Sequence, residues 1–451
     1  MPPPHNLRQD FVHKQMTRLL DHLRDIGDDW TETTEGAPVA PETVRRAREA
    51  ISESLRSETL PAGDYYSRSP VVSLVQSAFD EQPEDVRDRA RRDDGGPVLG
   101  IASSILARLF RGRHDFVDAP ARADLGRRVR LVLISDWATG REDAEHVAAR
   151  TWPFLYEPGV SAHLIHLGDT YYSGTQEEAQ RNVRDLWPVA AGDAGTIGSW
   201  ALNGNHDMYS GGYGLFEVTL GDERFARQRS DGRATSWFVL TTAGWNVVGL
   251  DTAWRHPEVD IRGDQLFIEG DLGHLHGSQV DALARCAADD RRLLVLSHHQ
   301  LFSAYDEAHF TFGPDRAAAT PLAEELADVL AAREIDAWFW GHEHDCLAYE
   351  RGFGRVGAAR AVGHGAVPTR VRRTPATPLG GGYPSYVVRP VTRDGDSDAL
   401  RALAWEYRAE RKDDDGRYLF KRGFAVLDID GRELTVRYVD DEGTTWLTES
   451  I

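Results

Sequence analysis

From Arg128 onward the chain alternates short runs of aliphatic and β-branched residues with stretches of helical spacing. Short apolar runs of this kind are typical of buried strands, and their alternation with helices predicts an α/β fold. Two further pairs of runs predict antiparallel hairpins, the second of which turns at Asp430-Gly431. The expected single strands span residues 128–135, 162–167, 200–202, 293–296 and 337–340, and the expected hairpins span residues 237–250 and 424–439.

The first 126 residues have a different pattern. Apolar residues recur at helical spacing over residues 6–26 and 42–57. Residues 98–110 are interpreted as a packed helix rather than a membrane-surface element, because their polar face carries few basic residues. Asp, Gly and Pro at residues 93–97 mark a loop or linker. Since 451 residues exceed the usual size of one hydrophobic core, we expect a helical N-terminal region (1–126) and a main α/β domain (127–451) that includes the C-terminal hairpin.

The chain is strongly acidic, with a formal net charge of −20. This charge argues against long nucleic acids and anionic membranes as partners, because their binding needs clustered Lys and Arg. The two cysteines, Cys286 and Cys346, are too few for a disulfide framework, which favours a reducing compartment. The N-terminus lacks the apolar core of a signal peptide, and no run of about 18 apolar residues occurs. We therefore expect a cytoplasmic protein without a transmembrane segment.

Polar motifs follow most of the expected strands, and each supplies Asp, Asn or His side chains that bind metal ions well. Taken singly, each motif has an ordinary explanation as a turn, a helix cap or a pair of surface imidazoles. Together they favour a metal site, because ligand sites of open α/β sheets lie beyond the carboxyl ends of the strands, where distant residues converge. In chain order the motifs are Ser135-Asp136-Trp137, Gly168-Asp169-Thr170-Tyr171-Tyr172, Gly204-Asn205-His206-Asp207, Ser297-His298-His299 and Gly341-His342-Glu343-His344.

Over residues 128–345 this order of motifs resembles the calcineurin-like metallophosphoesterase superfamily, whose pattern runs Asp, Gly-Asp, Gly-Asn-His-Asp/Glu, His and Gly-His-x-His. The resemblance implies a β-sandwich flanked by helices, with a site for two metal ions at one edge. It favours His298 over His299 as a ligand, and leaves His299 to a structural hydrogen bond or to a position facing the substrate. Carried over by position, it makes Asp169 the bridging carboxylate, Asp136 and His344 ligands of the first metal, and Asn205, His298 and His342 ligands of the second.

The first motif departs from the usual family pattern, because Ala138 stands where most members have a histidine ligand. Purple acid phosphatases also lack that histidine, and a tyrosine three residues after their bridging aspartate binds ferric iron. Tyr172 matches this spacing, so the resemblance to that branch implies Tyr172 as a ligand; the alternative is a tyrosine packed against the sheet. A phenolate suits a hard trivalent ion. The expected cofactors are two metal ions, with Fe(III) beside Zn, Mn or Fe(II) as the mixed pair.

The expected activity is metal-dependent hydrolysis of a small phosphate ester, with phosphomonoesters favoured and a metal-bound hydroxide as nucleophile. His206 is the candidate catalytic residue, because an imidazole can donate a proton to a leaving oxygen near neutral pH. Asp207 beside it is expected to orient the loop, with a capping or surface role as the equal alternative. Two alternatives stay open: a phosphodiesterase acting on nucleotides or lipid headgroups, and a non-catalytic scaffold. The loops at residues 209–233, 255–271 and 303–320 are expected to select the substrate.

Overall fold

The computed structural model describes residues 45, 70–81, 108, 111–255, 258–262, 265–269, 273–302, 320–349, 351–369, 402–404 and 421–451. Apart from single residues, the segments expected as helices at 6–26, 42–57 and 98–110, the linker at 93–97 and the loop at 303–320 lie outside this set.

A six-stranded sheet contains the first three motif-bearing strands and the C-terminal hairpin. Its strand order is β18-β17-β16-β2-β3-β4. The strands β2, β3 and β4 are parallel neighbours, and β16 pairs antiparallel with β2. The bounds are β2 Arg128–Ile134, β3 Ala162–His166, β4 Gly198–Ala201, β16 Gly423–Asp430, β17 Glu433–Asp440 and β18 Thr445–Ser450.

An eight-stranded sheet contains the other two motif-bearing strands, in the order β1-β7-β8-β11-β12-β14-β13-β15. Its centre is parallel, because β11 pairs in parallel with both β8 and β12. The bounds are β1 Ala121–Asp124, β7 Phe238–Thr241, β8 Trp245–Leu250, β11 Arg292–Ser297, β12 Ile335–Trp340, β13 Cys346–Tyr349, β14 Val356–Val362 and β15 Ala402–Ala404.

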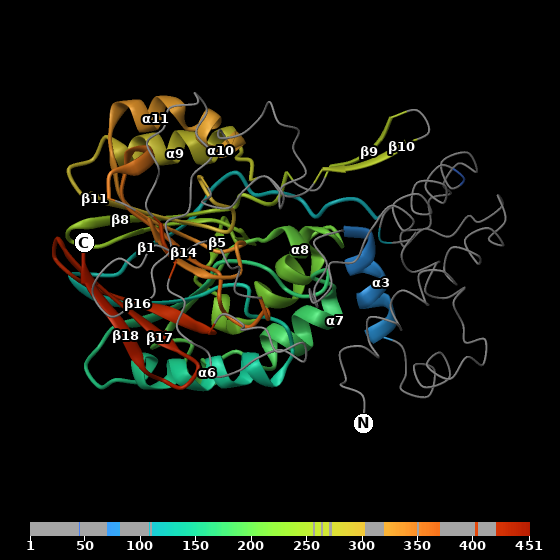
Figure 1. Cartoon of the computed structure of the whole chain (residues 1–451), viewed down its shortest axis with the longest axis horizontal. Helices are drawn as coiled ribbons and strands as arrows, with labels where there is room; N and C mark the ends of the chain where they lie inside the picture. The colour runs from blue at the N-terminus through green and yellow to red at the C-terminus, as the bar shows by residue number, and fades with distance from the viewer. Residues whose placement is uncertain are drawn as a thin grey trace.

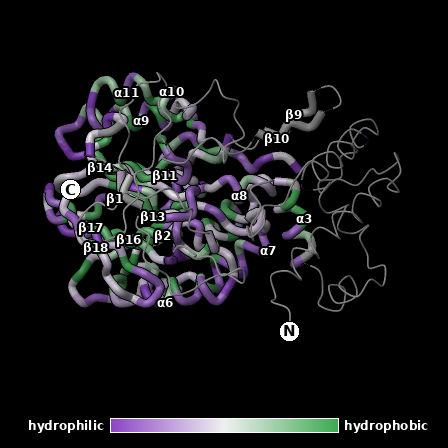
Figure 2. Tube along the Cα trace, viewed as in Figure 1, coloured by the Kyte–Doolittle hydropathy of each residue, from purple (hydrophilic) through white to green (hydrophobic). Residues whose placement is uncertain are grey.

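The two sheets stack face to face, and the alternation of β2 shows why. Its residues Val129, Leu131 and Leu133 join a core made by both sheets, whereas Val132 and Ile134 pack on the opposite face with α6 (Glu142–Leu155). The outer face of the larger sheet is covered by α9 (Gly277–Ala287), α10 (Pro321–Glu325) and α11 (Ala327–Ala332). Figure 1 shows the resulting layers, with α9–α11 above the sheets and α6 below. In Figure 2 the apolar positions gather on the central strands.

The expected β-sandwich flanked by helices is confirmed, and each strand or hairpin expected from the sequence is present. Several elements are additional. Strand β1 lies within the expected N-terminal region but pairs in parallel with β7. A boundary after residue 126 therefore separates β1 in sequence from the sheet to which it belongs. The expected loop at 255–271 contains an antiparallel pair, β9 (Glu258–Arg262) and β10 (Gln265–Glu269).

The remaining described elements are short, apart from one helix of the N-terminal region, and no described helix is long and apolar enough to cross a membrane. They are α3 (Pro70–Asp80), α7 (Gln176–Glu178), α8 (Asn205–Met208), β5 (Arg229–Ser230), β6 (Arg233–Ala234) and the helical turns η1 (Ala179–Arg184), η2 (Ala191–Asp193), η3 (Gly214–Thr219), η4 (Glu223–Phe225) and η6 (Phe353–Arg355).

Candidate metal centre

The five motifs meet because the strands before them end at the same edge of the sandwich. Asp136 and Asp169 follow the neighbouring strands β2 and β3, and Asn205 begins α8 shortly after β4. From the other sheet, His298 follows β11 and His342 follows β12. A backbone hydrogen bond from Gly341 N to His298 O, of 3.0 Å, joins the last two motifs. Ligands from two sheets therefore face one site.

The backbone at several of these positions is unusual. Six non-glycine residues of the described chain have a positive φ, and four of them are Asp136, Asp169, His342 and His344, with φ of 51°, 74°, 65° and 54°. The left-handed region costs an L-residue roughly 1–2 kcal/mol. Such strain persists where the surroundings enforce it and is frequent at functional sites. Four strained positions at the ends of three strands therefore support a functional site at this edge of the sandwich.

A first group of donor atoms surrounds the hydroxyl of Tyr171. This oxygen lies 3.0 Å from Asp136 Oδ1, 3.0 Å from Asp169 Oδ2 and 2.9 Å from His344 Nε2. The other oxygen of Asp136 is already occupied, because it accepts from Ser135 Oγ at 2.6 Å and from His342 N at 2.9 Å. Only Oδ1 of Asp136 is therefore directed at the group.

A second group forms around the amide oxygen of Asn205. That oxygen lies 3.0 Å from His298 Nε2 and 3.0 Å from His342 Nδ1. The orientation of the amide is set by Tyr209, whose hydroxyl accepts from Asn205 Nδ2 at 2.7 Å. His298 Nε2 is also 3.3 Å from Asp169 Oδ1. Asp169 thus presents one oxygen to each group, which is the geometry of a bridging ligand.

These separations fit two metal ions. In an octahedral shell with bonds of about 2.1 Å, neighbouring donor atoms lie roughly 3 Å apart. The ring of His298 gives a further test, since its Nδ1 lies 3.0 Å from the carbonyl of Leu167 and must carry the proton. Its Nε2 therefore faces two oxygen acceptors, so that either a second proton or a cation must lie between them. The donor set of carboxylates, an amide oxygen and imidazoles suits divalent and trivalent ions.

The carboxylates and imidazoles of the site shift one another's pKa values. Burial alone would raise the pKa of Asp169, but the neighbouring histidines, led by His298, hold it well below its usual range. Burial is the largest single effect on His298 and lowers its pKa, but the charge and hydrogen bond of Asp169, with Asp136 and Asp207 nearby, together raise the pKa to about 9. Burial, with Asp136 and Asp169 nearby, raises the pKa of the Tyr171 phenol well above its ordinary value. A phenol between two carboxylates ionises only when a cation compensates the charge.

His206 lies beside both groups without joining either. The backbone N–H of His206 donates to Asp169 Oδ1 at 2.9 Å, and the ring Nδ1 lies 2.5 Å from the carbonyl oxygen of Tyr172. A carbonyl only accepts, so Nδ1 carries the proton and Nε2 is the atom left for chemistry. That Nε2 lies 4.0 Å from Asp169 Oδ2. The ring can therefore hand a proton to, or take one from, a group held at the site.

Asp207 is buried, caps a helix and connects two of the motifs. One of its oxygens accepts from Gly204 N at 2.8 Å, as a helix cap, and from Asp169 N at 3.1 Å, which ties the second and third motifs together. Burial, reinforced by the charge of Asp169, raises the pKa of Asp207 to about 7. Gly204 is required sterically, because a Cβ there would lie 2.2 Å from Asp169 Oδ1.

The tyrosine hydroxyl among these ligands belongs to Tyr171, one residue before the position that the sequence spacing predicts. The backbone of Tyr172 makes two hydrogen bonds: its N–H donates to Glu178 Oε1 at 2.6 Å, and its carbonyl accepts from His206. Its side chain lies in a small buried cluster with Tyr171 and Val367. Tyr171 N donates to Ala138 O at 3.0 Å, beside the place of the missing histidine. The path of this loop decides between adjacent tyrosines, and no signal in the sequence distinguishes them.

His299 lies close to the site and also makes a structural hydrogen bond. His298, His299 and His342 offer nitrogen atoms that all lie within 4.8 Å of one another, as do the ligand atoms of Asp136, Asp169 and His298. The Nδ1 of His299 lies 2.9 Å from Thr252 Oγ1, which also accepts the N–H of His299 at 3.1 Å. A hydrogen bond of this kind orients an imidazole next to a metal.

A sequence profile of the family described as calcineurin-like phosphoesterase matches residues 129–346. This match spans all five motifs and ends just after the last of them. Residues 129–346 belong to the calcineurin-like phosphoesterase family. The family assignment supports a phosphoesterase hydrolase and metal binding by the His and Asp groups described above.

Several solved structures are similar to this chain at low sequence identity. A dimetal phosphatase from Danio rerio is 13% identical, with 72% of this chain and 99% of that chain covered and a TM-score of 0.41. GAP50, described as the anchor in the inner membrane complex of Plasmodium, is 12% identical, with 72% and 89% covered and a TM-score of 0.44. PhoD is 9% identical, with 74% and 70% covered and a TM-score of 0.42. No curated protein sequence matches the chain significantly.

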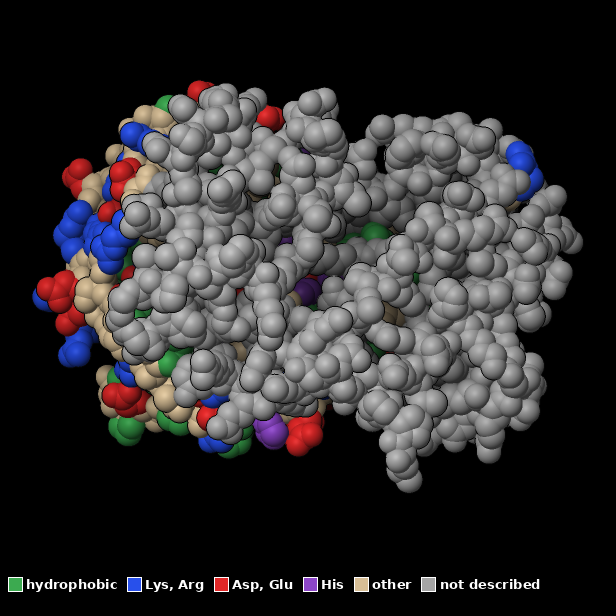
Figure 3. Space-filling view, viewed as in Figure 1, with side chains coloured by type: hydrophobic (Ala, Val, Ile, Leu, Met, Phe, Trp, Pro, Cys, Tyr) green, Lys and Arg blue, Asp and Glu red, His purple; other side chains and the backbone are tan. Residues whose placement is uncertain are grey.

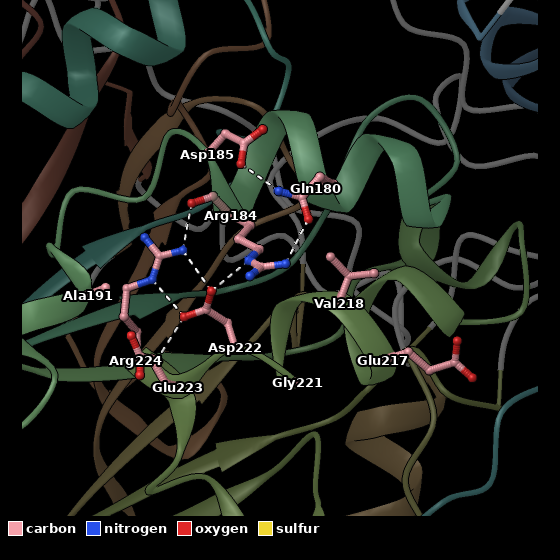
Figure 4. A pocket seen from close by; sticks show the side chains of 10 residues that line it. All are labelled: Gln180, Arg184, Asp185, Ala191, Glu217, Val218, Gly221, Asp222, Glu223 and Arg224. Atoms are coloured by element: carbon pink, nitrogen blue, oxygen red, sulfur yellow. Dashed lines mark hydrogen bonds and ion pairs between the residues drawn. The ribbon is translucent and has the colours of Figure 1, made fainter.

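The candidate ligand residues are almost completely buried. In the space-filling view histidine surface is visible deep in the middle of the face shown, between residues that are not described (Figure 3). A separate pocket of about 590 Å³ lies over η1, η3 and η4, and no candidate ligand lines it. Both guanidinium groups there, Arg184 and Arg224, donate to Asp222, at 2.8 and 2.7 Å (Figure 4). These ion pairs leave that pocket poorly suited to a phosphate.

Proposed function

We propose that this protein is a dinuclear metal-dependent phosphoesterase that acts on small phosphate esters, with phosphomonoesters favoured. The observation that carries the proposal is the pair of donor groups that share Asp169, each with separations near 3 Å. When bound, two cations supply Lewis acidity, which activates water and offsets the charge of the phosphoryl group. A chain of net charge −20 also needs such cations to attract an anionic substrate.

The protein's own residues have distinct parts in this proposal. Asp136, Tyr171 and His344 hold the first ion, Asn205, His298 and His342 hold the second, and Asp169 holds both. Tyr171 takes the place that sequence spacing gave to Tyr172. Fe(III) at the first site beside Zn, Mn or Fe(II) at the second follows from the hard phenolate and the imidazole-rich set, respectively.

His206 is proposed as the proton donor to the leaving oxygen. Burial lowers the pKa of its ring, although Asp169 opposes the shift. The hydrogen bond from Nδ1 to the Tyr172 carbonyl fixes the ring, so that a proton on Nε2 is held toward the site. When the ring of His206 is neutral, Nε2 can accept a proton, and when the ring is protonated, Nε2 can donate one.

Elemental analysis and an absorption spectrum of protein purified without chelators test the proposal, followed by a panel of aryl phosphate monoesters and diesters on the same sample. We expect about two metal ions per chain and faster hydrolysis of monoesters. Preferential cleavage of diesters would replace the monoesterase assignment. Absence of both bound metal and hydrolysis under several metal supplements would instead indicate a non-catalytic scaffold.

A further inference from the structure

Glu178 is a buried carboxylate that fixes the loop after Asp169. Its Oε1 accepts from the N–H of Tyr172 at 2.6 Å, and its Oε2 accepts from the N–H groups of Ser173 at 3.0 Å and Thr175 at 3.1 Å. The side chain is fully buried. Hydrogen bonds to an ionised acceptor are the strong ones. Three of them on one carboxylate give successive residues of the loop a single position.

The loop held by Glu178 carries two groups of the candidate metal centre. One is the hydroxyl of Tyr171, which lies among Asp136, Asp169 and His344. The other is the carbonyl of Tyr172, which accepts from the ring of His206. A shift of Glu178 would therefore move a proposed ligand and the proposed proton donor together.

A further donor to Glu178 comes from the N-terminal region. Ser77, on α3, places its Oγ 2.8 Å from Glu178 Oε1 and is itself fully buried. At the end of the same helix, the side chain of Glu81 has a hydrogen bond with that of Thr175. Figure 1 shows α3 beside α7, which ends at Glu178. Helix α3 thus contacts the loop twice, although it lies outside the residues matched by the family profile.

We propose that Ser77 and Glu178 are positioning residues, through which docking of α3 holds Tyr171 and His206 in the arrangement needed for turnover. The proposal rests on the phosphoesterase function and gives the N-terminal region a role in it. A serine that only fills space would be replaceable by alanine without effect on the loop. A serine that positions Glu178 needs its hydroxyl.

The test compares three full-length variants with the wild type. Ser77→Ala removes the hydroxyl, and Ser77→Thr retains it. Ser73→Ala is the matched control, because Ser73 is a buried serine one turn earlier on α3 whose carbonyl, which Ser77 also contacts at 3.1 Å, is kept. Two quantities are measured: deuterium exchange of peptides covering residues 171–178 in metal-free protein, and kcat and KM for an aryl phosphate after metal loading.

We expect Ser77→Ala to speed exchange of the loop about tenfold and to lower kcat by a similar factor, with KM changed less than about twofold. Ser77→Thr should restore both quantities, and Ser73→Ala should match the wild type. Equal exchange and equal kcat in Ser77→Ala and Ser73→Ala would overturn the inference. If Ser77→Ala does not fold, Glu178→Gln is tested instead, because its amide has a donor in place of one acceptor oxygen. Unchanged deuterium exchange of the loop in Glu178→Gln would also overturn the inference.

Failure of the proposed function is distinguishable. A wild type that hydrolyses no phosphate ester overturns that function, while faster exchange in Ser77→Ala, reversed in Ser77→Thr, still supports the contact between α3 and the loop. If the wild type is active but Ser77→Ala has the same loop exchange and the same kcat, the positioning role is overturned and the phosphoesterase activity stands.

Discussion

At the scale of single residues, Tyr171 and Tyr172 are neighbours whose contacts have different consequences. The hydroxyl of Tyr171 is 2.9–3.0 Å from three proposed ligand atoms. The backbone of Tyr172 instead connects Glu178 to His206. In our proposal, one tyrosine contributes an oxygen to the site, and the other keeps the loop and the histidine in place.

Removing each phenol in turn separates the two tyrosines. If Fe(III) occupies the first site, Tyr171→Phe should abolish the visible charge-transfer band of the oxidised protein and weaken first-site metal binding about 10- to 100-fold. Tyr172→Phe keeps the backbone contacts and should keep the band. Absorption spectra and metal titrations measure both effects. A band that disappears in Tyr172→Phe and persists in Tyr171→Phe would restore the assignment based on spacing.

His298 and His299 can be distinguished by metal retention. His298 Nε2 faces Asn205 and Asp169, whereas His299 Nδ1 is directed to Thr252. We therefore expect His298→Gln to lose the second metal on dialysis, and His299→Gln to weaken its binding by only about tenfold. Elemental analysis after dialysis gives the comparison. The opposite ranking would mean that His299 is the ligand.

His206→Ala should lower kcat by about 10²–10⁴-fold, because it removes a proton donor and no proposed ligand. Metal content should remain at the wild-type level, since the N–H that binds Asp169 is a backbone group. Kinetics and elemental analysis on one preparation measure the two effects. Loss of a metal from this variant would show that His206 is a ligand rather than an acid.

At the scale of secondary-structure elements, β14 and β18 are joined across the sandwich by a partly buried ion pair, in which Arg360 is the buried partner. Arg360 donates to both oxygens of Glu449, at 2.7 and 2.7 Å, and Tyr438 donates to the same carboxylate at 2.7 Å. Burial alone would raise the pKa of Glu449, but the hydrogen bonds and charge of Arg360 lower it below its ordinary value. The pair connects the eight-stranded and six-stranded sheets.

The folded protein therefore gains stability from Glu449 above its unfolded pKa of about 4.3 and loses it as the pH falls through the lower folded pKa. We expect Glu449→Gln to reduce the free energy of unfolding by about 3 kcal/mol at pH 7, because it leaves Arg360 buried without a counter-charge. The difference from the wild type should shrink below about pH 4. Denaturant unfolding across this pH range measures it.

Glu442→Gln is the control for this prediction, because Glu442 pairs with Lys421 but keeps 71% of its own side chain accessible. Its effect should be much smaller. Equal effects of the two substitutions at pH 7 would contradict a special contribution from the pair of Arg360 and Glu449.

At the scale of the whole molecule, the candidate centre joins the two sheets. Asp136, Asp169 and Asn205 follow strands of the smaller sheet, whereas His298 and His342 follow strands of the larger one. A metal ion that binds only this assembled arrangement stabilises the entire fold. The increment is about 2.7 kcal/mol when the free metal is at 100 times its dissociation constant.

Chelation should therefore lower the unfolding midpoint of the wild type, and added metal should restore it. In Asp169→Asn, which weakens both groups at once, the metal-dependent increment should be largely lost. Thermal unfolding with and without chelator tests this expectation. An unchanged midpoint in the wild type would contradict binding of metal between the sheets.

The sequence alone determined the strands and the kinds of ligand. Runs such as residues 128–135 show their burial through local apolar character, and each motif lies next to a run, so the edge where they meet follows from general rules of α/β sheets. Strands without such a signature, including β1 and β18, were not anticipated, because their pairing depends on the neighbours they find.

Only the tertiary structure decided which atoms meet. The choice of Tyr171, the division of Asp169 into one oxygen per group and the contact of Ser77 with Glu178 depend on backbone turns and on residues far apart in the chain. Ser77 and Glu178, for example, are 101 residues apart. Local sequence fixes residue type and periodicity, but a side chain's direction is set by the φ and ψ that packing imposes, as at Asp136 and His344. The sequence therefore determines the types of candidate ligand, and the fold determines how they are arranged.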